Sequence, residues 1–285
     1  MFPPSVLGRK EMIASMIRGI RMRIRIGIAL VAALATVGIA AGCGGDNENK
    51  YGLITEGTLT VGSDIPYPPF EFGRAPNYKG IDIELVEGIA KQLDLTVEWQ
   101  DTSFDTIFRD VAQGKFDMVA SSTTITPERL KEVDFSDPYF LADQSLMVKK
   151  GGDIKTVDDV AGQVVGAQKG TTGAAYAEDQ TDASTVRTYP EITDAFNALQ
   201  AGQVSAVIND CPISKYAEKS KPDLQVVEAL PTGEKYGFAF QKGSTDLEDA
   251  VNGALADLKK NGTYNQIFRK YLAAQPCREL PGASG

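Results

Sequence analysis

The sequence predicts an α/β fold in two halves, each built on its own small sheet. From Tyr51 onward, short β-branched runs alternate with amphipathic segments, which is the pattern of α/β proteins. The order strand, helix, glycine and strand occurs twice, within residues 58–120 and again within 164–208. We therefore expect two lobes of strand and helix.

The individual elements follow from the spacing of apolar side chains. Ile81, Leu85 and Ile89 recur at helical intervals and predict a helix over 81–93. The same spacing predicts four more helices, three of them ended by a glycine: around 107–111 (Gly114), 192–199 (Gly202) and 247–258 (Gly262), and over 263–272. Strands are expected at 58–62, 96–99, 116–120, 164–167, 204–208 and 236–240.

Composition excludes several classes of function. The 285 residues contain no histidine, so Ser-His-Asp and Cys-His catalysis and His-ligated zinc or haem are excluded. Three widely spaced cysteines cannot form a four-thiolate cluster. A net charge of −9 argues against a nucleic-acid partner, which would require a basic stripe. We expect neither a metal ion nor a cofactor.

The first residues have the order of a secretory signal. Residues 1–25 carry six basic side chains and one acid, and an apolar run over 26–41 follows that is short for a membrane span. The sequence Ala40-Ala41-Gly42-Cys43 resembles a bacterial lipobox, in which Cys43 becomes the first mature residue and carries lipid. The alternative is a plain signal peptide, because Ala40 stands where a lipobox usually has leucine. We expect a signal peptide over 1–42 and a flexible tether over 43–57.

Polar side chains follow four of the predicted strands. Ligands of open α/β sheets bind outside the carboxyl ends of the strands, so these positions are the candidate site. The positions are Ser63-Asp64, then 121–124, then 168–173, and finally Asn209-Asp210. Hydroxyls, amides and carboxylates therefore gather where a polar ligand would be bound.

Arg129 and Asp210 are the charged candidates. Thr126 and Pro127 suit the start of a helix, where the cation of Arg129 would oppose the helix dipole. An anionic partner would explain Arg129, since a guanidinium binds a carboxylate through two parallel hydrogen bonds. The alternative is a solvated surface arginine. Asp210 could accept from an ammonium group, or it could cap a helix that starts at Pro212.

The remaining candidates are weaker taken alone. The turn Gly170-Thr171-Thr172-Gly173 could present backbone N–H groups to an anion, although it lacks the Walker pattern. Tyr67 and Phe104 are aromatic residues in polar, turn-rich loops. Each could contact a ligand or belong to the core.

Together these features resemble the family-3 extracellular solute-binding proteins, the polar amino-acid receptors of ABC importers. The resemblance extends over about 58–272, and its most specific block is residues 117–139. It is carried by VGSD (61–64), YPPFEF (67–72), GIDIEL (80–85), DMVASSTTITPER (117–129), VDFSDPY (133–139), GTT (170–172) and ND (209–210).

The resemblance implies a periplasmic-binding-protein-like fold, with two α/β lobes joined by two hinge strands and an amino acid held in the cleft. It places residues 58–147 and 232–275 in the first lobe, 148–231 in the second, and 276–285 in a tail. The chain would cross between lobes near Met147-Val148 and near 228–231. It also implies a monomer that is anchored outside the cytoplasmic membrane by lipid and delivers its ligand to the permease subunits.

The resemblance also implies roles for single residues. Arg129 would bind the ligand's α-carboxylate, helped by N–H groups near Thr124 and Thr172, and Asp210 would bind the α-ammonium group. The other predicted binding residues are Asp64, Tyr67, Phe104, Ser122, Thr123, Gln168 and Thr171. An anionic Asp64 would favour Arg, Lys, His or Gln as ligand.

Two further interpretations concern the cysteines and the class of function. Export permits oxidation, so we expect a disulfide between Cys211 and Cys277, with two free thiols as the alternative. A cleft enzyme on the same fold, similar to cyclohexadienyl or arogenate dehydratases, is the alternative function. The complete set of groups for binding an amino acid favours a binding protein.

Overall fold

The structure is a computed structural model, and it describes residues 49–272 together with Cys277. The expected signal peptide over 1–42, the lipidated Cys43, the first part of the tether and nearly all of the tail lie outside the described residues. Everything below concerns the unit that begins at Asn47. Within its described part, none of the helices has the length and apolar character needed to cross a membrane.

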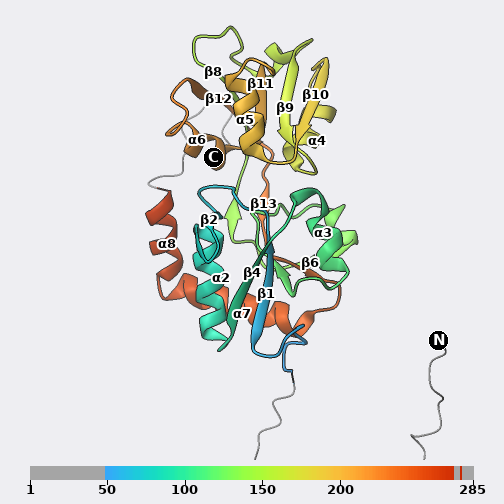
Figure 1. Cartoon of the computed structure of the whole chain (residues 1–285), viewed down its shortest axis with the longest axis vertical. Coiled ribbons are helices and arrows are strands. Elements are labelled where there is room, and N and C mark those ends of the chain that lie inside the picture. Colours follow the sequence, from blue (N-terminus) through green and yellow to red (C-terminus); the bar gives the residue numbers. More distant parts are fainter. Residues whose placement is uncertain (1–48, 273–276, 278–285) are drawn as a thin grey trace, which may run out of the picture. The chain divides into compact units, whose positions relative to one another are not determined.

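The first sheet contains five strands in the order β4-β1-β5-β14-β6 (Figure 1). The strands are β1 (Thr58–Ser63), β4 (Thr96–Asp101), β5 (Met118–Val119), β6 (Val133–Phe135) and β14 (Ala239–Gln241). Strands β4, β1 and β5 are parallel, and β14 runs antiparallel between β5 and β6. Two chain segments distant in sequence therefore build this sheet.

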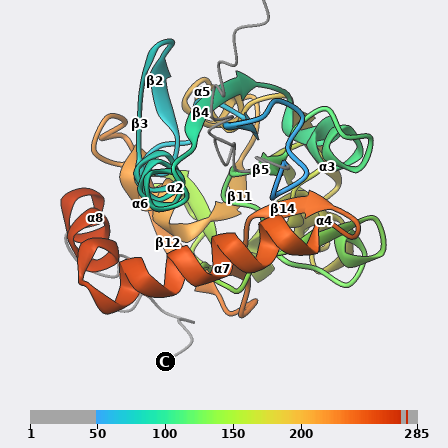
Figure 2. The same cartoon turned by 90° about the horizontal axis from the view of Figure 1, so that it is seen from below.

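Helices α2 (Ile81–Gln92), α3 (Phe104–Ala112), α7 (Thr245–Lys260) and α8 (Thr263–Tyr271) belong to the same lobe. Leu85 and Ile89 of α2 are fully buried, as are Leu59 and Val61 of β1, so the apolar face of α2 forms part of the core. Figure 2 shows α7 running beside α2, with α8 continuing from it. We call this sheet with its four helices the first lobe.

The second sheet also contains five strands, in the order β10-β9-β11-β8-β12. They are β8 (Gln144–Lys149), β9 (Val164–Gln168), β10 (Thr185–Tyr189), β11 (Ala206–Asp210) and β12 (Leu224–Leu230), with helices η2 (Val157–Val160), α4 (Thr172–Asp179), α5 (Ile192–Gln200) and α6 (Cys211–Ala217). Strands β10, β9 and β11 are parallel, and β8 runs antiparallel to both β11 and β12. We call this sheet and its helices the second lobe.

Short elements lie between and beside the sheets. Strands β2 (Phe72–Arg74) and β3 (Asn77–Lys79) form a hairpin, and β7 (Phe140–Leu141) pairs with β13 (Lys235–Tyr236). The helix that was expected to begin near Thr126 is only the short 3₁₀ turn η1 (Arg129–Lys131). The strand expected over 236–240 is divided, because the N–H groups of Gly237 and Phe238 are bonded to Thr123 and Ser136.

The two-lobe α/β architecture is confirmed, and the chain passes twice between the sheets. The first crossing was expected near Met147-Val148, and that position is wrong. Met147 lies inside β8 and pairs with Val207 and Val226 of the second sheet, so the chain has already crossed before Gln144. The second crossing follows Leu230, where β12 ends, and reaches β13 at Lys235.

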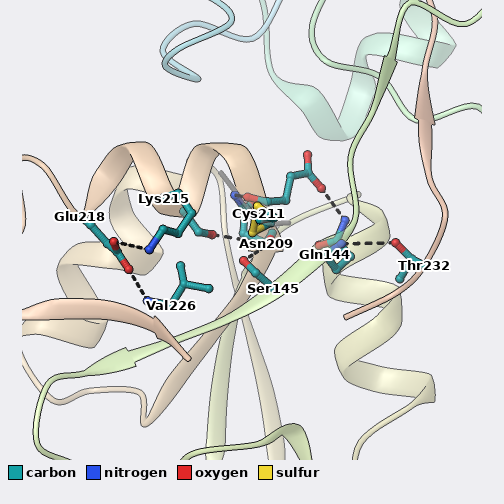
Figure 3. The surroundings of a disulfide bond; sticks show 11 residues. Gln144, Ser145, Asn209, Cys211, Lys215, Glu218, Val226 and Thr232 are labelled. Carbon is teal, nitrogen blue, oxygen red and sulfur yellow. Dashed lines mark hydrogen bonds and ion pairs between the residues drawn. A yellow bond between two sulfur atoms is a disulfide. The ribbon is translucent and has the colours of Figure 1, made fainter. Parts of the chain in front are cut away.

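A disulfide joins Cys211 to Cys277, with a Cα–Cα distance of 6.1 Å. Figure 3 shows it among Ser145, Asn209 and Gln144 of the second sheet. Cys211 is the first residue of α6 and is fully buried. Cys277, which follows α8 in the chain, is thereby linked covalently to the second lobe.

Candidate functional site

A narrow pocket lies where the carboxyl ends of strands from both lobes meet. Its lining contains every predicted binding residue except Thr123, together with Ser121. The lining residues are Asp64, Tyr67, Phe104, Ser121, Ser122, Thr124, Arg129, Gln168, Thr171, Thr172 and Asp210. Thr123 was predicted to bind the ligand, but it does not line the pocket. Its buried side chain instead donates to the Gly237 carbonyl and fixes the chain entering β14.

Arg129 is held in the pocket by neutral groups. Its Nη1 donates to the Thr124 carbonyl at 2.7 Å and its Nη2 donates to the Gly170 carbonyl of the other lobe at 3.1 Å. The guanidinium carbon lies 4.3 Å from the centre of the Phe108 ring. Burial lowers the pKa of Arg129 to about 10, against the opposing effect of nearby carboxylates, so the side chain remains cationic at neutral pH. In the described residues no carboxylate forms an ion pair with it.

Asp210 ends β11 and is held by three side chains. Its Oδ2 accepts from the hydroxyls of Tyr67, at 2.8 Å, and Tyr236, and its Oδ1 accepts from the Gln144 amide. Although it stands at the N-cap position of α6, its side chain makes no capping bond, so the capping alternative is wrong. Burial, and then the nearby Glu234 carboxylate, raise the pKa of Asp210 to about 6, against the three donors.

Asp64 and Gln168, one from each lobe, meet in the lining of the pocket. The Gln168 Nε2 donates to the Asp64 Oδ2 at 2.6 Å and to the Pro190 carbonyl at 3.0 Å. Burial raises the pKa of Asp64 to about 7, and the carboxylates of Glu191 and Asp101 add to this effect. The Glu191 Oε2 is buried without a hydrogen-bond partner. Among the described residues, none of these three acids forms an ion pair with a lysine or arginine.

The two aromatic candidates both line the pocket. Tyr67 is 6% exposed and its hydroxyl also donates to Asn209 at 2.9 Å, so it connects the first lobe to β11. Phe104 begins α3 and packs edge-to-face on Phe108, with ring centres 5.8 Å apart. Phe108 in turn supports the Arg129 guanidinium, so this aromatic pair positions a charge as well as forming a wall.

The sequence analysis missed Glu234, which lies on the second crossing segment. Its Oε2 accepts from the hydroxyls of Thr172 at 2.6 Å and Thr124 at 2.8 Å, one from each lobe. The Gln144 Nε2 donates to the same carboxylate at 3.2 Å. Gln144 therefore stands between two carboxylates, Glu234 and Asp210, and Tyr236 supports the second. The only signal for Glu234 in the sequence was its position as an acid just before the strand expected over 236–240.

The arrangement suits a small zwitterion with a polar side chain. One fixed cation and one fixed anion line the same pocket and come from different lobes. Hydroxyl side chains line the same pocket, and so do Asp64 and Gln168, which are bonded to each other. Among the described residues no histidine or cysteine nucleophile lines the pocket.

Residues 59–274 match the family model described as bacterial extracellular solute-binding proteins, family 3. The L-cystine-binding protein TcyJ of Escherichia coli (strain K12) is 32% identical over 252 residues, covering 87% of this chain and 92% of TcyJ.

Two solved structures are also similar. An ancestral arginine-binding protein bound to glutamine has a TM-score of 0.74 and 38% identity, covering 77% of this chain and all of that one. The ancestral amino acid-binding protein AncCDT-1, a precursor of cyclohexadienyl dehydratase, has a TM-score of 0.71 and 39% identity, covering 75% and 95%.

Proposed function

Since the chain belongs to family 3 of the bacterial extracellular solute-binding proteins, we propose that it is the substrate-binding lipoprotein of an ABC importer for a polar or basic L-amino acid. The observation that carries the proposal is the placement of Arg129 and Asp210, from different lobes, on one pocket. A zwitterion needs both charges at once. Uptake rather than catalysis is the proposed role.

In this proposal Arg129 binds the α-carboxylate, with N–H groups near Thr124 and Thr172. Asp210 binds the α-ammonium group, together with the Ser122 carbonyl and the Thr124 hydroxyl. Thr124 and Thr172 donate to Glu234 in the structure, so the ligand competes with that carboxylate for their hydroxyls.

The rest of the pocket would recognise the ligand's side chain. Tyr67 and Phe104 enclose its apolar part, and Asp64 and Gln168 bind its polar end. Thr171 caps α4 by accepting from the Ala174 N–H, and so holds the turn that carries Thr172.

Bound amino acid would bridge the lobes. Closure of two domains around a ligand is a known mode of motion in periplasmic binding proteins. Here the ligand would favour closure because the two charges that bind it come from different lobes. The ligand must bind the closed arrangement more tightly than the open one to shift the equilibrium. The lobes already contact each other through Arg129 and Gly170, and through Gln168 and Asp64.

Export, the lipid on Cys43 and delivery to a membrane permease remain parts of this proposal. Mass spectrometry of the membrane-extracted protein would detect a diacylated Cys43 as the first residue. A soluble product cleaved without lipid would contradict the anchor and leave ligand binding untouched.

Calorimetry of the delipidated protein against the twenty amino acids tests the proposal directly. We expect saturable binding of one or a few polar or basic amino acids and none of the large apolar ones. Absence of binding to all twenty would contradict the proposed function.

Binding of a cationic side chain is expected to strengthen as pH rises through 7. Asp64 is partly protonated near pH 7 in the absence of ligand, and a cation beside it requires the carboxylate, so binding releases a proton below that pH. Between pH 6 and 8 the affinity for arginine should rise about tenfold more than the affinity for glutamine. Glutamine is the control, because the pKa of Asp210 affects both ligands equally.

Asp64→Asn should remove this difference and lower the affinity for arginine more than for glutamine. The carboxylates of Glu191 and Asp101 stay in place, so the variant isolates the Asp64 charge. Because folding raises the pKa of Asp64, its contribution to stability is present below its unfolded pKa and lost as pH rises through about 7. A wild-type arginine affinity with an unaltered pH profile would contradict the assignment.

A dehydratase is the second candidate, and one observation favours it. The raised pKa of Asp64 would suit a general acid in the pocket, and the similar protein AncCDT-1 is a precursor of cyclohexadienyl dehydratase. Turnover assays with prephenate and arogenate separate the two functions. We expect no product, since Arg129 and Asp210 complete a site for an amino acid.

A further inference from the structure

Ser122 has a backbone conformation that a serine rarely adopts. Its φ is +49°, in the left-handed region, and the residue lines the pocket three positions after the end of β5. A residue other than glycine is strained in this region, and such strain persists only where the surroundings impose it. Its carbonyl oxygen accepts no hydrogen bond from the described residues.

A buried carboxylate imposes this conformation. Asp82 Oδ2 accepts the Ser122 N–H at 2.8 Å, and the Tyr139 hydroxyl donates to Asp82 at 2.8 Å. Asp82 is completely buried in the first turn of α2, where the helix dipole favours a negative charge. The peptide group between Ser121 and Ser122 is therefore oriented by a buried side chain of α2.

A second buried acid holds the same turn from another side. Glu71 is completely buried, and its two oxygens accept from Ser121 Oγ at 3.2 Å and Ser122 Oγ at 3.3 Å. Ser121 Oγ accepts in turn from the Asp64 N–H at 2.9 Å. Glu71 thus connects the turn at Ser122, through Ser121, with the backbone of Asp64 in the pocket lining.

The two acids are costly to bury. In the described residues neither Glu71 nor Asp82 forms an ion pair with a lysine or arginine. Burial raises the pKa of Glu71 well above its usual value, helped by Asp82 and Asp64, and raises that of Asp82 to about 6. Apolar residues would fill this space at lower cost, so stability alone does not account for the pair.

We propose that Asp82 and Glu71 are positioning residues that hold Ser122 in its left-handed backbone conformation, so that its carbonyl oxygen faces the ligand's ammonium group. Asp82 fixes the Ser122 N–H, and Glu71 fixes the Ser122 side chain and, through Ser121, its spacing from Asp64. This inference rests on the proposed function, and neither acid touches the ligand.

The test compares three substitutions on α2, with affinity measured by calorimetry for the amino acid that wild type binds. Asp82→Ala removes the acceptor and should weaken binding at least about tenfold. Asp82→Asn keeps an acceptor oxygen for the Ser122 N–H and should stay within about threefold of wild type. Glu84→Ala, also in the first turn of α2 but bonded to Lys270 and Tyr271, is the matched control and should bind like wild type.

Rescue by asparagine distinguishes orientation of the Ser122 peptide from general packing. Wild-type affinity in Asp82→Ala, or an equal loss in Glu84→Ala, would overturn the inference.

If Asp82→Ala does not fold, Tyr139→Phe is the second variant. It loosens Asp82 while leaving its bond to Ser122 possible, and it should lower the affinity a few-fold. Unchanged affinity in Tyr139→Phe would then overturn the inference. Failure of wild type to bind any amino acid would instead contradict the proposed function.

Discussion

Asp210→Asn is expected to weaken amino-acid binding by about 30- to 5,000-fold. Removing one partner of a buried charge pair costs on the order of 2–5 kcal/mol, and each 1.4 kcal/mol is a factor of ten in affinity. Asparagine has the shape of aspartate and keeps an oxygen for the hydroxyls of Tyr67 and Tyr236. What it lacks is the negative charge that the ligand's ammonium group requires.

Although Asp210→Asn should bind the ligand more weakly, it should be at least as stable as wild type. Folding raises the pKa of Asp210 to about 6, so at pH 7 the side chain is ionised, but its charge destabilises the folded protein relative to the unfolded chain. The Gln144 Oε1, which is buried without a partner, can turn to accept from the new amide. We therefore expect an unfolding midpoint at pH 7 equal to or above that of wild type, measured without ligand.

Arg129→Gln removes the other charge of the proposed site, the one that would bind the ligand's α-carboxylate. It should lose affinity to a similar extent, because glutamine cannot supply a charged fork to a carboxylate. Retained affinity in either variant, or losses that follow the unfolding midpoint, would contradict the two-charge site.

The polar ends of the strands could be predicted because local sequence determines them. The runs that form β1, β9 and β11 are apolar and are each followed by polar residues, so Asp64, Gln168 and Asp210 could be placed at the sheet edges. Their convergence into one pocket followed from the resemblance, since spacing alone does not fix how two sheets face each other.

Glu234 and Gln144 could not be predicted because long-range contacts place them. Gln144 begins β8 and Glu234 precedes β13, and nothing local indicates that the Gln144 amide bonds to both Asp210 and Glu234. The strain at Ser122 was equally invisible, because the N–H of Ser122 is bonded to Asp82, forty residues earlier in the chain. Long-range hydrogen bonds decided these positions.

The first crossing was misplaced for a related reason. The run from Gln144 to Val148 would fit the end of either lobe, and its pairing with both β11 and β12 assigns it to the second. The short turn at Arg129 differs from the expected helix because β6 already begins at Val133 and leaves no room for a longer helix. The pairing of β6 with β14 in the first sheet fixes that strand.

Reduction of the Cys211–Cys277 disulfide is expected to lower the free energy of unfolding by about 4 kcal/mol. The bond joins residues 66 positions apart, and in the chain-entropy model a loop of that length restricts the unfolded state by about this amount. Urea unfolding with and without reductant measures the change.

Cys277→Ala is the matched control for that measurement. It leaves the fully buried Cys211 in place as a small apolar side chain, so no polar group enters the core. The variant should unfold at the midpoint of reduced wild type and should not respond to reductant.

Ligand affinity is measured in the same samples, because Cys211 directly follows Asp210 at the start of α6. If the bond acts on the unfolded chain, affinity should change far less than stability. A wild-type midpoint that is insensitive to reductant would contradict a stabilising role for this bond, whereas a large loss of affinity with little loss of stability would show that the bond positions Asp210 instead.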